Sequence, residues 1–340
     1  MSGRGCGESR FGPIGPFDIQ PEDFGEPQSL SFDYPTVAIG VMQGTDTGDV
    51  FAWTVGSPDL TPSLRPDLTT CPGMMSNGVL VFTRFSPDPG VRWGVWACDT
   101  ANGGVEFPIS VGGASSDSRS YPQISGTTVV WQENHGGQWD IRGATFDRVT
   151  HLVTDTFWVA HRATSEKTPR IAGNWVVWRD RRSGRWDIYA RNLVTGVVRA
   201  VCTNTATQDQ PWTDGGWVVW RDWRNAGLTG ADIYGRRLVS WTRVRAICRA
   251  RGRQEQPRVA AGFVVWTDWR KASYSRFGGL HDTDVYAWDA VTGNVFRVAG
   301  GPDMEHQAET AHGVVMFLRH RSEFRDTPWG GKVLGANLAR

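Results

Sequence analysis

Carboxylates and arginines recur at a fixed spacing in the middle of the chain and could perform chemistry. The recurring residues are Asp180 and Arg182, Asp222 and Arg224, and Asp268 and Arg270, each followed by an Asp that opens the next strand, at Asp187, Asp232 and Asp284. Paired carboxylates can act in general acid–base catalysis. A catalytic pair should be unique, whereas this pattern recurs in three repeats, and Glu133 and Asp140 take the same places in a fourth. We therefore expect a structural role, in which each Asp accepts turn N–H groups and pairs with Arg.

Four tryptophans lie near these turns, and their position predicts a surface that binds a ligand or partner. Two precede the Asp of the following strand and two lie inside the Asp-x-Arg turn, so all four should share one rim of hairpin loops. The predicted ligand-binding set is Trp139, Trp186, Trp223 and Trp269 with Arg182, Arg224 and Arg270. Exposed aromatic residues with polar neighbours bind sugars or anchor protein partners. The alternative is that each indole packs over a neighbouring Arg in a cation–π contact.

A run of arginines alternates with small apolar residues and contains no acid between Asp232 and Glu255. Its regular part is Arg243, Arg245, Arg249 and Arg251. This alternation predicts a strand with one solvated face. We expect it to be an outermost strand, where charge protects the edge from pairing with other sheets. The alternative is a surface for an anionic partner such as a polysaccharide or an acidic protein, whose binding would depend steeply on salt.

All these residues belong to a unit of roughly 40–50 residues that repeats along the chain. Each unit has an x-Pro-x-apolar-x-Gly segment, a Val-Val-Trp strand, a polar turn, an Asp-Ile-Tyr strand, a Thr-Gly turn and a last strand. Four short strands joined by tight turns should pair antiparallel. A period in this range with four strands per unit is typical of a β-propeller blade.

The repeats predict an all-β propeller of seven blades with four antiparallel strands each, with six blades as the alternative. Strong copies are centred on Trp131, Trp178, Trp220 and Trp266, which we expect to fill the wedge between blades, and weaker copies lie at residues 36–40, 78–82 and 313–316. Residues 29–340 should form this single domain. The last unit ends after its third strand. We therefore hypothesise that a stretch within residues 10–28 of the Gly/Pro-rich N-terminal segment 1–28 supplies the missing outer strand.

The repeats resemble the TolB-like (WD40-like) β-propeller repeats from about residue 121 to residue 293. Gln-Pro starts at Gln210 and Gln256, the Val-Val-Trp-x-Asp-x-Arg strand end, the Asp-Ile-Tyr strand and the Thr-Gly turns carry this resemblance. It implies that the Pro-containing strand lines the axis and favours an extracytoplasmic location. It implies no single function, since such blades serve as scaffolds, binding modules and enzyme frames.

Metal and cofactor chemistry has little support in the sequence. Five cysteines occur without a Cys-x-x-Cys or Cys/His spacing. Cys202 and Cys248 occupy the same place in neighbouring repeats and are predicted to be small buried apolar residues, whereas pairing between Cys71 and Cys98 stays open. We predict no metal and no cofactor; the nearest approach to a metal site is the set His306, Gln307 and His312.

Composition excludes several classes of partner. The net charge is +1, so no global field points to nucleic acid or an anionic membrane. No apolar run approaches the ~18–20 residues of a transmembrane helix. The N-terminus lacks the apolar core of roughly 7–15 residues that a signal peptide needs, so the protein either stays inside the cell or is a mature form or fragment.

The leading functional prediction is a non-catalytic propeller that binds a protein or glycan through its Trp- and Arg-bearing rim. The first alternative is a polysaccharide lyase or glycoside hydrolase with its site over the axial channel. An enzyme should show His, Asp or Glu residues that do not repeat and that converge on the channel mouth. The second alternative is a structural subunit of a surface layer, filament or larger complex.

Overall fold

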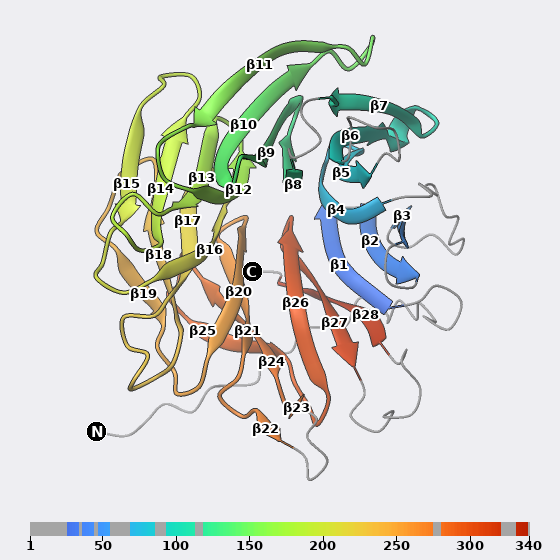
Figure 1. Ribbon diagram of the computed structural model, residues 1–340. Coiled ribbons are helices and arrows are strands. Elements are labelled where there is room, and N and C mark those ends of the chain that lie inside the picture. The colour runs from blue at the N-terminus through green and yellow to red at the C-terminus, as the bar shows by residue number, and fades with distance from the viewer. Residues whose placement is uncertain are drawn as a thin grey trace, which may run out of the picture.

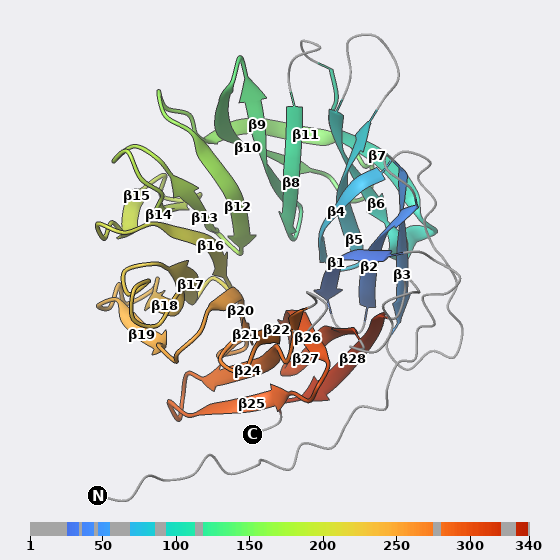
Figure 2. The same cartoon turned by 60° about the horizontal axis from the view of Figure 1, so that its bottom comes forward.

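The computed structural model describes residues 26–33, 36–43, 47–54, 69–85, 93–112, 118–274, 280–320 and 331–338. Seven antiparallel sheets are arranged radially around one axis, with the first strand of each sheet innermost (Figures 1 and 2). Five of these sheets have four strands and two have three. The predicted propeller, with seven blades, is confirmed. The described residues include no helix with the length and apolar character needed to cross a membrane.

The blades are numbered in chain order. Blade 1 is β1 (Glu26–Asp33), β2 (Thr36–Gln43) and β3 (Thr47–Thr54), and blade 2 is β4 (Thr69–Ser76), β5 (Val79–Phe85), β6 (Trp93–Asp99) and β7 (Val105–Ser110). Blade 3 is β8 (Ser118–Ser125), β9 (Thr128–His135), β10 (Gln138–Phe146) and β11 (Val153–Ala160). Blade 4 is β12 (Glu166–Ala172), β13 (Trp175–Asp180), β14 (Asp187–Asn192) and β15 (Val198–Cys202).

Blade 5 is β16 (Gln208–Thr213), β17 (Trp217–Asp222), β18 (Asp232–Arg237) and β19 (Arg245–Cys248). Blade 6 is β20 (Gln254–Ala260), β21 (Phe263–Asp268), β24 (Asp284–Asp289) and β25 (Val295–Ala299), with a small ribbon of β22 (Ser273–Tyr274) and β23 (Leu280–His281) in its hairpin. Blade 7 is β26 (Met304–Ala311), β27 (Val314–His320) and β28 (Gly331–Asn337). A short 3-10 helix, η2 (Thr100–Asn102), connects β6 and β7.

The inner strands of blades 3 to 7 share a bulge, which lies in the Pro-containing segment of blades 3 to 6 and is present without proline in blade 7. The register against the second strand shifts at the same place in each blade. One residue there has a positive φ of 50–54°: Tyr121, Thr168, Gln210, Gln256 and Gln307. The backbone N–H of Thr168 is satisfied by Gln132 Oε1 of the preceding blade at 2.8 Å, and that of Gln256 by Gln210 Oε1 at 2.8 Å. The bulges thus connect neighbouring blades close to the axis.

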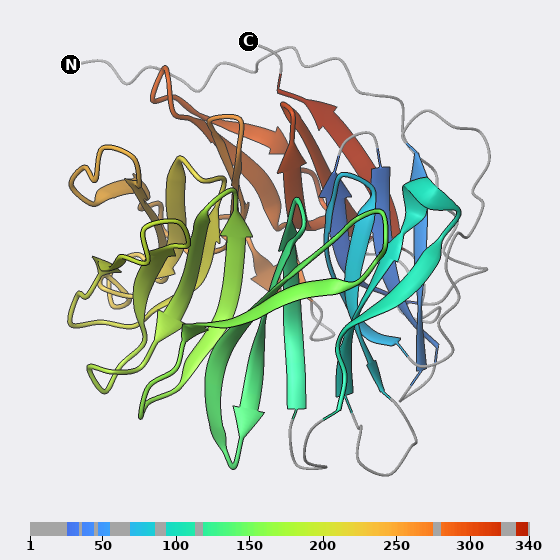
Figure 3. The same ribbon diagram turned by 90° about the horizontal axis from the view of Figure 1, so that it is seen from above.

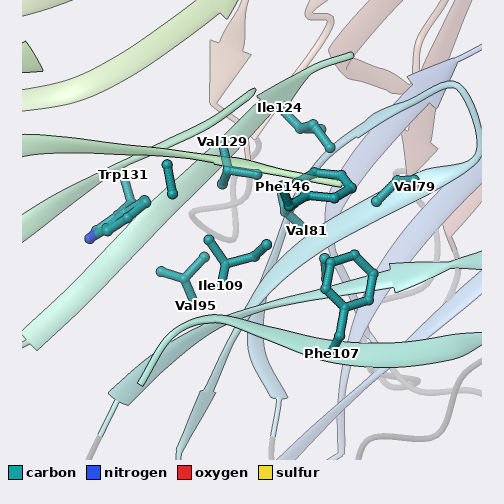
Figure 4. Close-up of a cluster of buried hydrophobic side chains, with 11 residues drawn as sticks. Val79, Val81, Val95, Phe107, Ile109, Ile124, Val129, Trp131 and Phe146 are labelled. Carbon is teal, nitrogen blue, oxygen red and sulfur yellow. The ribbon is translucent and has the colours of Figure 1, made fainter. Parts of the chain in front are cut away.

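The hydrophobic core lies between blade faces, as the apolar runs predict. Figure 4 shows the wedge between blades 2 and 3, where Val79 and Val81 of β5 and Phe107 and Ile109 of β7 meet Trp131 and its neighbours. The tryptophans of the four strong repeats are at most 1% exposed. In blade 7 the aromatic residue at this position is Phe317, because Met316 pairs with Glu309 as Val177 pairs with Arg170.

Each strong Asp-x-Arg turn forms a closed polar cluster, which we call the blade lock. In blade 4, Trp178 Nε1 donates to Asp180 Oδ2 at 3.0 Å, and the Arg182 backbone N–H and Nε both donate to Asp180 Oδ1 at 2.9 Å. The Arg182 guanidinium then covers the Tyr189 ring at 3.7 Å. Blades 5 and 6 repeat these contacts around Asp222 and Asp268. Asp180, Asp222 and Asp268 thus accept the turn N–H and pair with Arg, as the sequence predicts. The second Asp of each repeat differs, since Asp187, Asp232 and Asp284 each have a buried oxygen without a hydrogen-bond partner among the described residues.

The ring closes without a strand shared between its ends in the described part of the chain. Blades 1 and 7 each contribute three strands, and their inner strands β1 and β26 lie side by side (Figures 1 and 3). Residues 26–28 belong to β1. The rest of the segment proposed to close the ring lies outside the described residues, so that hypothesis, and the domain boundary at residue 28, stay predictions.

Candidate functional site

The four rim tryptophans lie in the hairpins between second and third strands of blades 3 to 6, each partly exposed. A cation lies over every one of them. Lys167 Nζ is 4.6 Å from the Trp139 ring centroid, and the guanidinium carbons of Arg179, Arg221 and Arg253 lie 4.4, 5.0 and 4.2 Å from the rings of Trp186, Trp223 and Trp269. These contacts are the cation–π alternative. Ligand binding by the rim stays a prediction.

The other predicted residues are found in distinct places. Arg182, Arg224 and Arg270 belong to blade locks, so their guanidinium groups are already paired. Arg243, Arg245, Arg249 and Arg251 are exposed on and beside β19, the outermost strand of blade 5, as predicted. The thiols of Cys202 and Cys248 are buried and free, and Cys98 is also a free thiol, which answers the open question of its pairing with Cys71.

The three residues nearest to a metal site do not converge. His306 and Gln307 lie in the first half of β26, whereas His312 follows its last residue. At ~3.3 Å per residue of strand, the two imidazoles are separated by most of the strand length. Among the described residues, no group of three or more His, Cys, Asp or Glu side chains could hold a metal ion.

Side chains that sequence reasoning missed converge on the axis. One residue per blade occupies the same register position on the inner strand, and we call these five residues the axial belt: Gln123, Arg170, Trp212, Arg258 and Glu309. The indole of Trp212 lies between two guanidinium groups, 4.6 Å from Arg170 and 3.9 Å from Arg258. Arg258 Nε donates to Glu309 Oε1 at 2.5 Å.

Burial perturbs the charged members of the axial belt. Burial, followed by the charge of Arg258, lowers the pKa of Arg170 to about 9. Burial raises the pKa of Glu309 although both arginines oppose the shift. Met74 of β4, on the far side of the ring, packs against the hydrophobic cluster that contains Trp212. Side chains from blades on opposite sides of the ring therefore meet near the axis.

A second charged layer surrounds the channel mouth on the face that carries the Trp hairpins. We call it the charged collar: Lys167, Arg179, Asp209, Arg221 and Glu255. Lys167 and Arg179 are cross-strand partners in blade 4, as Asp209 and Arg221 are in blade 5. Arg221 is paired with Asp209 at 2.7 and 2.8 Å and with Glu255 at 2.5 Å.

The blade 4 side of the collar places two positive charges side by side, and the charge of Asp209 opposes the burial that lowers the pKa of Arg179. Within the part of the chain that the structure describes, neither Lys167 nor Arg179 forms an ion pair with a carboxylate. Burial and the charge of Arg179 lower the pKa of Lys167. The signal that could have found both layers is positional: within otherwise constant repeats, these positions change from Gln to Arg, Trp and Glu.

Comparison with solved structures confirms the fold. The β-propeller domain of the trilobed protease from Pyrococcus furiosus matches with a TM-score of 0.66 at 13% identity, over 93% of this chain and 98% of that one. Acylaminoacyl peptidase from Pyrococcus horikoshii matches with a TM-score of 0.64 at 12% identity, over 94% of this chain but only 53% of its own. An oligogalacturonate lyase in complex with manganese matches with a TM-score of 0.63 at 12% identity, over 93% and 90%.

These likenesses correct the leading functional prediction. The similar propellers belong to peptidases and to a lyase. The prediction of a non-catalytic binding or scaffold module is therefore wrong, and the enzymatic alternative is favoured. No family model matches the chain, and no curated protein does either, so membership of the TolB-like family is not established. The chain spans about half the length of the peptidases that it matches.

Proposed function

We propose that the propeller is a lyase whose active site is the hairpin-face mouth of the axial channel, and that its substrate is an oligosaccharide with carboxylate-bearing sugar units. The observation that carries the proposal is the pair Lys167 and Arg179, which lies beside the axial belt and forms no ion pair among the described residues. Two adjacent cations that are not in ion pairs favour an anionic substrate. The end-to-end match to oligogalacturonate lyase supports the same class.

The two cations have different tasks in this proposal. Arg179, with a guanidinium that can grip a carboxylate through two N–H groups, neutralises the uronate and makes the neighbouring C–H more acidic. Lys167, whose pKa is lowered, takes that proton as the general base. The electron pair left on carbon forms a C=C bond, the C–O bond to the leaving sugar breaks, and that oxygen takes a proton from water. The axial belt is the floor under the substrate.

A metal of the kind present in the oligogalacturonate lyase does not fit the candidate residues of this chain. His306 and His312 lie toward opposite ends of β26. Gln210 Oε1 and Gln132 Oε1, on the strands around the axis, already accept backbone N–H groups. We therefore derive no step through a metal ion.

The test is an elimination assay on Lys167→Ala. The unsaturated product absorbs in the ultraviolet, so its release from polygalacturonate, alginate or glucuronan can be followed directly. We expect wild type to act on at least one of these polymers, and Lys167→Ala to lose about 10²–10⁴-fold in kcat. Lys271→Ala, in a hairpin of blade 6, is the matched control and should retain the rate. Absence of product from all three polymers, or full activity of Lys167→Ala, would refute the proposal.

A second candidate is the propeller part of a peptidase. The similar propeller of the trilobed protease is described as having an open velcro topology, and blades 1 and 7 share no strand within the described residues of this chain. Under this candidate, the same mouth would admit peptides rather than sugars. The peptidase candidate would be favoured if the protein bound an acidic peptide, if oligouronates did not displace that peptide, and if the protein showed no elimination activity.

A further inference from the structure

One turn in blade 5 departs from the repeat in a way that carries a conformational cost. The turn between third and fourth strands places a residue with positive φ at the same position in blades 3 to 6. Blades 4 and 6 have glycine there, Gly196 at φ 70° and Gly293 at φ 75°. Blade 3 has His151 at φ 59°, and blade 5 has the bulkier Trp241 at φ 45°. A left-handed conformation costs a non-glycine residue ~1–2 kcal/mol. Backbone strain of this kind is concentrated at functional sites in proteins.

The strained indole holds two arginines in the groove between the outer strands of blades 4 and 5. The guanidinium carbon of Arg236 lies 4.5 Å from the Trp241 ring centroid and that of Arg199 lies 5.0 Å from it. Trp175 of blade 4 stacks at 6.3 Å and fixes the ring in place. The two positive charges are thus brought together by aromatic contacts.

Neither of these guanidinium groups is neutralised by a carboxylate within blades 4 and 5, which the structure describes completely. Arg236 Nη1 donates to the Val201 carbonyl at 2.9 Å, and its Nε is buried without a partner. Burial, and the positive charge of Arg199, lower the pKa of Arg236. Two adjacent guanidinium groups that are not paired with carboxylates favour an anion.

A pocket of about 320 Å³ opens beside them. Arg236 and Val244 line it on the blade 5 side, together with Arg224, and residues 200–204 of blade 4 line the other side. Asn204 adds an amide to this lining. A volume at the lower end of the ~300–1,000 Å³ range of ligand pockets suits one or two sugar units.

The surface around the pocket is strongly basic. Residues 166–253 carry 17 Lys and Arg against 7 Asp and Glu. Six of those acids are at most 8% exposed and the seventh is partly buried, whereas several arginines on the outer surface are exposed. Arg199 lies beside the groove, whereas the exposed Arg237 and Arg245 lie over the rings of Trp217 and Trp288 on the blade 6 side. Arg243, Arg249 and Arg251 are exposed on and beside β19. Burying the acids leaves an outer surface of one sign, which suits an extended polyanion rather than a single small ion.

We propose that the groove between blades 4 and 5 is a second binding site, separate from the axial channel, for an acidic polysaccharide. One carboxylate-bearing sugar enters the pocket against Arg236, and the following units run past Arg199, which shares the Trp241 ring with Arg236, over the basic outer surface. The anionic character of the ligand follows from these residues alone. Its choice as a polyuronate rests on the proposed lyase function, in which such a site would retain the polymer between turnovers.

The test is direct binding, measured by titration calorimetry with galacturonate oligomers and with neutral malto-oligosaccharides as a comparison. Trp241→Gly restores the residue of blades 4 and 6 and relieves the backbone strain, but it also removes the packing of the indole on Trp175. Its melting temperature is therefore measured alongside to show that the variant is folded. Because Trp241→Gly releases both arginines, it should weaken oligouronate binding by about tenfold or more. Arg199→Ala should weaken binding about five- to tenfold. Arg191→Ala is the matched control: Arg191 takes the place of Arg236 in the groove between blades 3 and 4, bonding the Trp158 and Val159 carbonyls, where no indole replaces Gly196.

The outcomes separate this site from the proposed activity. Loss of binding in Trp241→Gly and Arg199→Ala, with binding retained in Arg191→Ala, supports the second site whether or not the protein shows lyase activity. Equal binding by wild type and by Trp241→Gly, equal affinity for the neutral oligosaccharide, or no oligouronate binding by wild type would each overturn it. Binding that responds equally to all three variants would also overturn it, since that result places the ligand elsewhere on the basic surface.

Discussion

Glu166 stands at a position where the neighbouring repeats have an amide. It pairs in register with Asp180 as Gln208 does with Asp222 and Gln254 with Asp268. Its side chain is fully buried, and both of its oxygens lack a hydrogen-bond partner among the described residues. Burial, followed by the charges of Asp180 and Asp140, raises its pKa to about 8, although Arg182 opposes this. The neutral carboxylic acid therefore takes the place of the amide.

This carboxyl group makes the stability of the protein pH-dependent, and Glu166→Gln tests that. The folded state keeps the proton to a higher pH than the unfolded state does, so the free energy of unfolding should fall as pH rises from about 4.5 to about 8. Glu166→Gln should flatten this part of the pH profile and be more stable than wild type at pH 8. Urea unfolding across that range is the measurement.

The converse variant is the control. Gln208→Glu puts the carboxyl group at the matching place in blade 5, opposite Asp222. We expect it to add a further loss of stability between the same pH values. A pH profile identical to that of wild type would show that the position does not control protonation.

At the scale of single residues, the sequence predicts what repeats. The buried Trp is recognisable because four blades carry it, and the Asp-x-Arg lock because three blades do. Arg170, Trp212 and Glu309 could not be predicted in the same way. Their shared position is hidden by the bulge, which shifts the register of each inner strand before the axial belt, and their contacts form only when blades meet.

At the scale of elements, the connections between strands tolerate substitution of glycine unequally. Gly252, between blades 5 and 6, has φ 90°, and a Cβ there would lie 2.7 Å from the Trp269 carbonyl oxygen. Gly196, in the turn between β14 and β15, has φ 70° with nothing within 4 Å of such a Cβ. The sequence predicts a turn at Gly196 but gives no sign that Gly252 lies against another segment.

We therefore predict that Gly196→Ala costs ~1–2 kcal/mol, the price of a left-handed conformation alone, and that Gly252→Ala costs more than Gly196→Ala because backbone atoms must also move. Chemical denaturation of the two variants gives the comparison. Equal losses would mean that the close approach at Gly252 relaxes freely.

At the scale of the whole molecule, blades 1 and 7 meet at a seam and share no strand within the described residues. The repeat pattern predicts seven blades, but it cannot predict the closure because the end copies are the weakest. The second strand of blade 1, Thr36–Gln43, lacks the Val-Val-Trp triplet. The second strand of blade 7, Val314–His320, has Phe317 where the strong repeats have Trp. The function was mispredicted for a related reason, since repeats describe architecture and the site lies in positions that differ between them.

The N-terminal segment is the remaining test of closure. Deleting residues 1–25 removes the proposed closing segment and keeps β1 intact. If the segment completes blade 7, the melting temperature should fall by several degrees, because 1 kcal/mol corresponds to ~2–4 °C for a domain of 150–250 residues. A truncated protein with the same melting temperature as wild type would contradict the hypothesis.

The blade lock has a consequence for how such a chain can change over generations. Trp178, Asp180, Arg182 and Tyr189 all come from one hairpin, so the carboxylate of the lock finds its partners inside its own blade. In blades 5 and 6 the lock Arg also donates to the Cys of the preceding blade. Duplicating or deleting a whole unit leaves no orphaned carboxylate behind. Only the contacts between blades must be rebuilt, and these are made largely by similar apolar faces. Length can therefore vary in steps of one unit, while the few positions around the axis are free to diverge in chemistry.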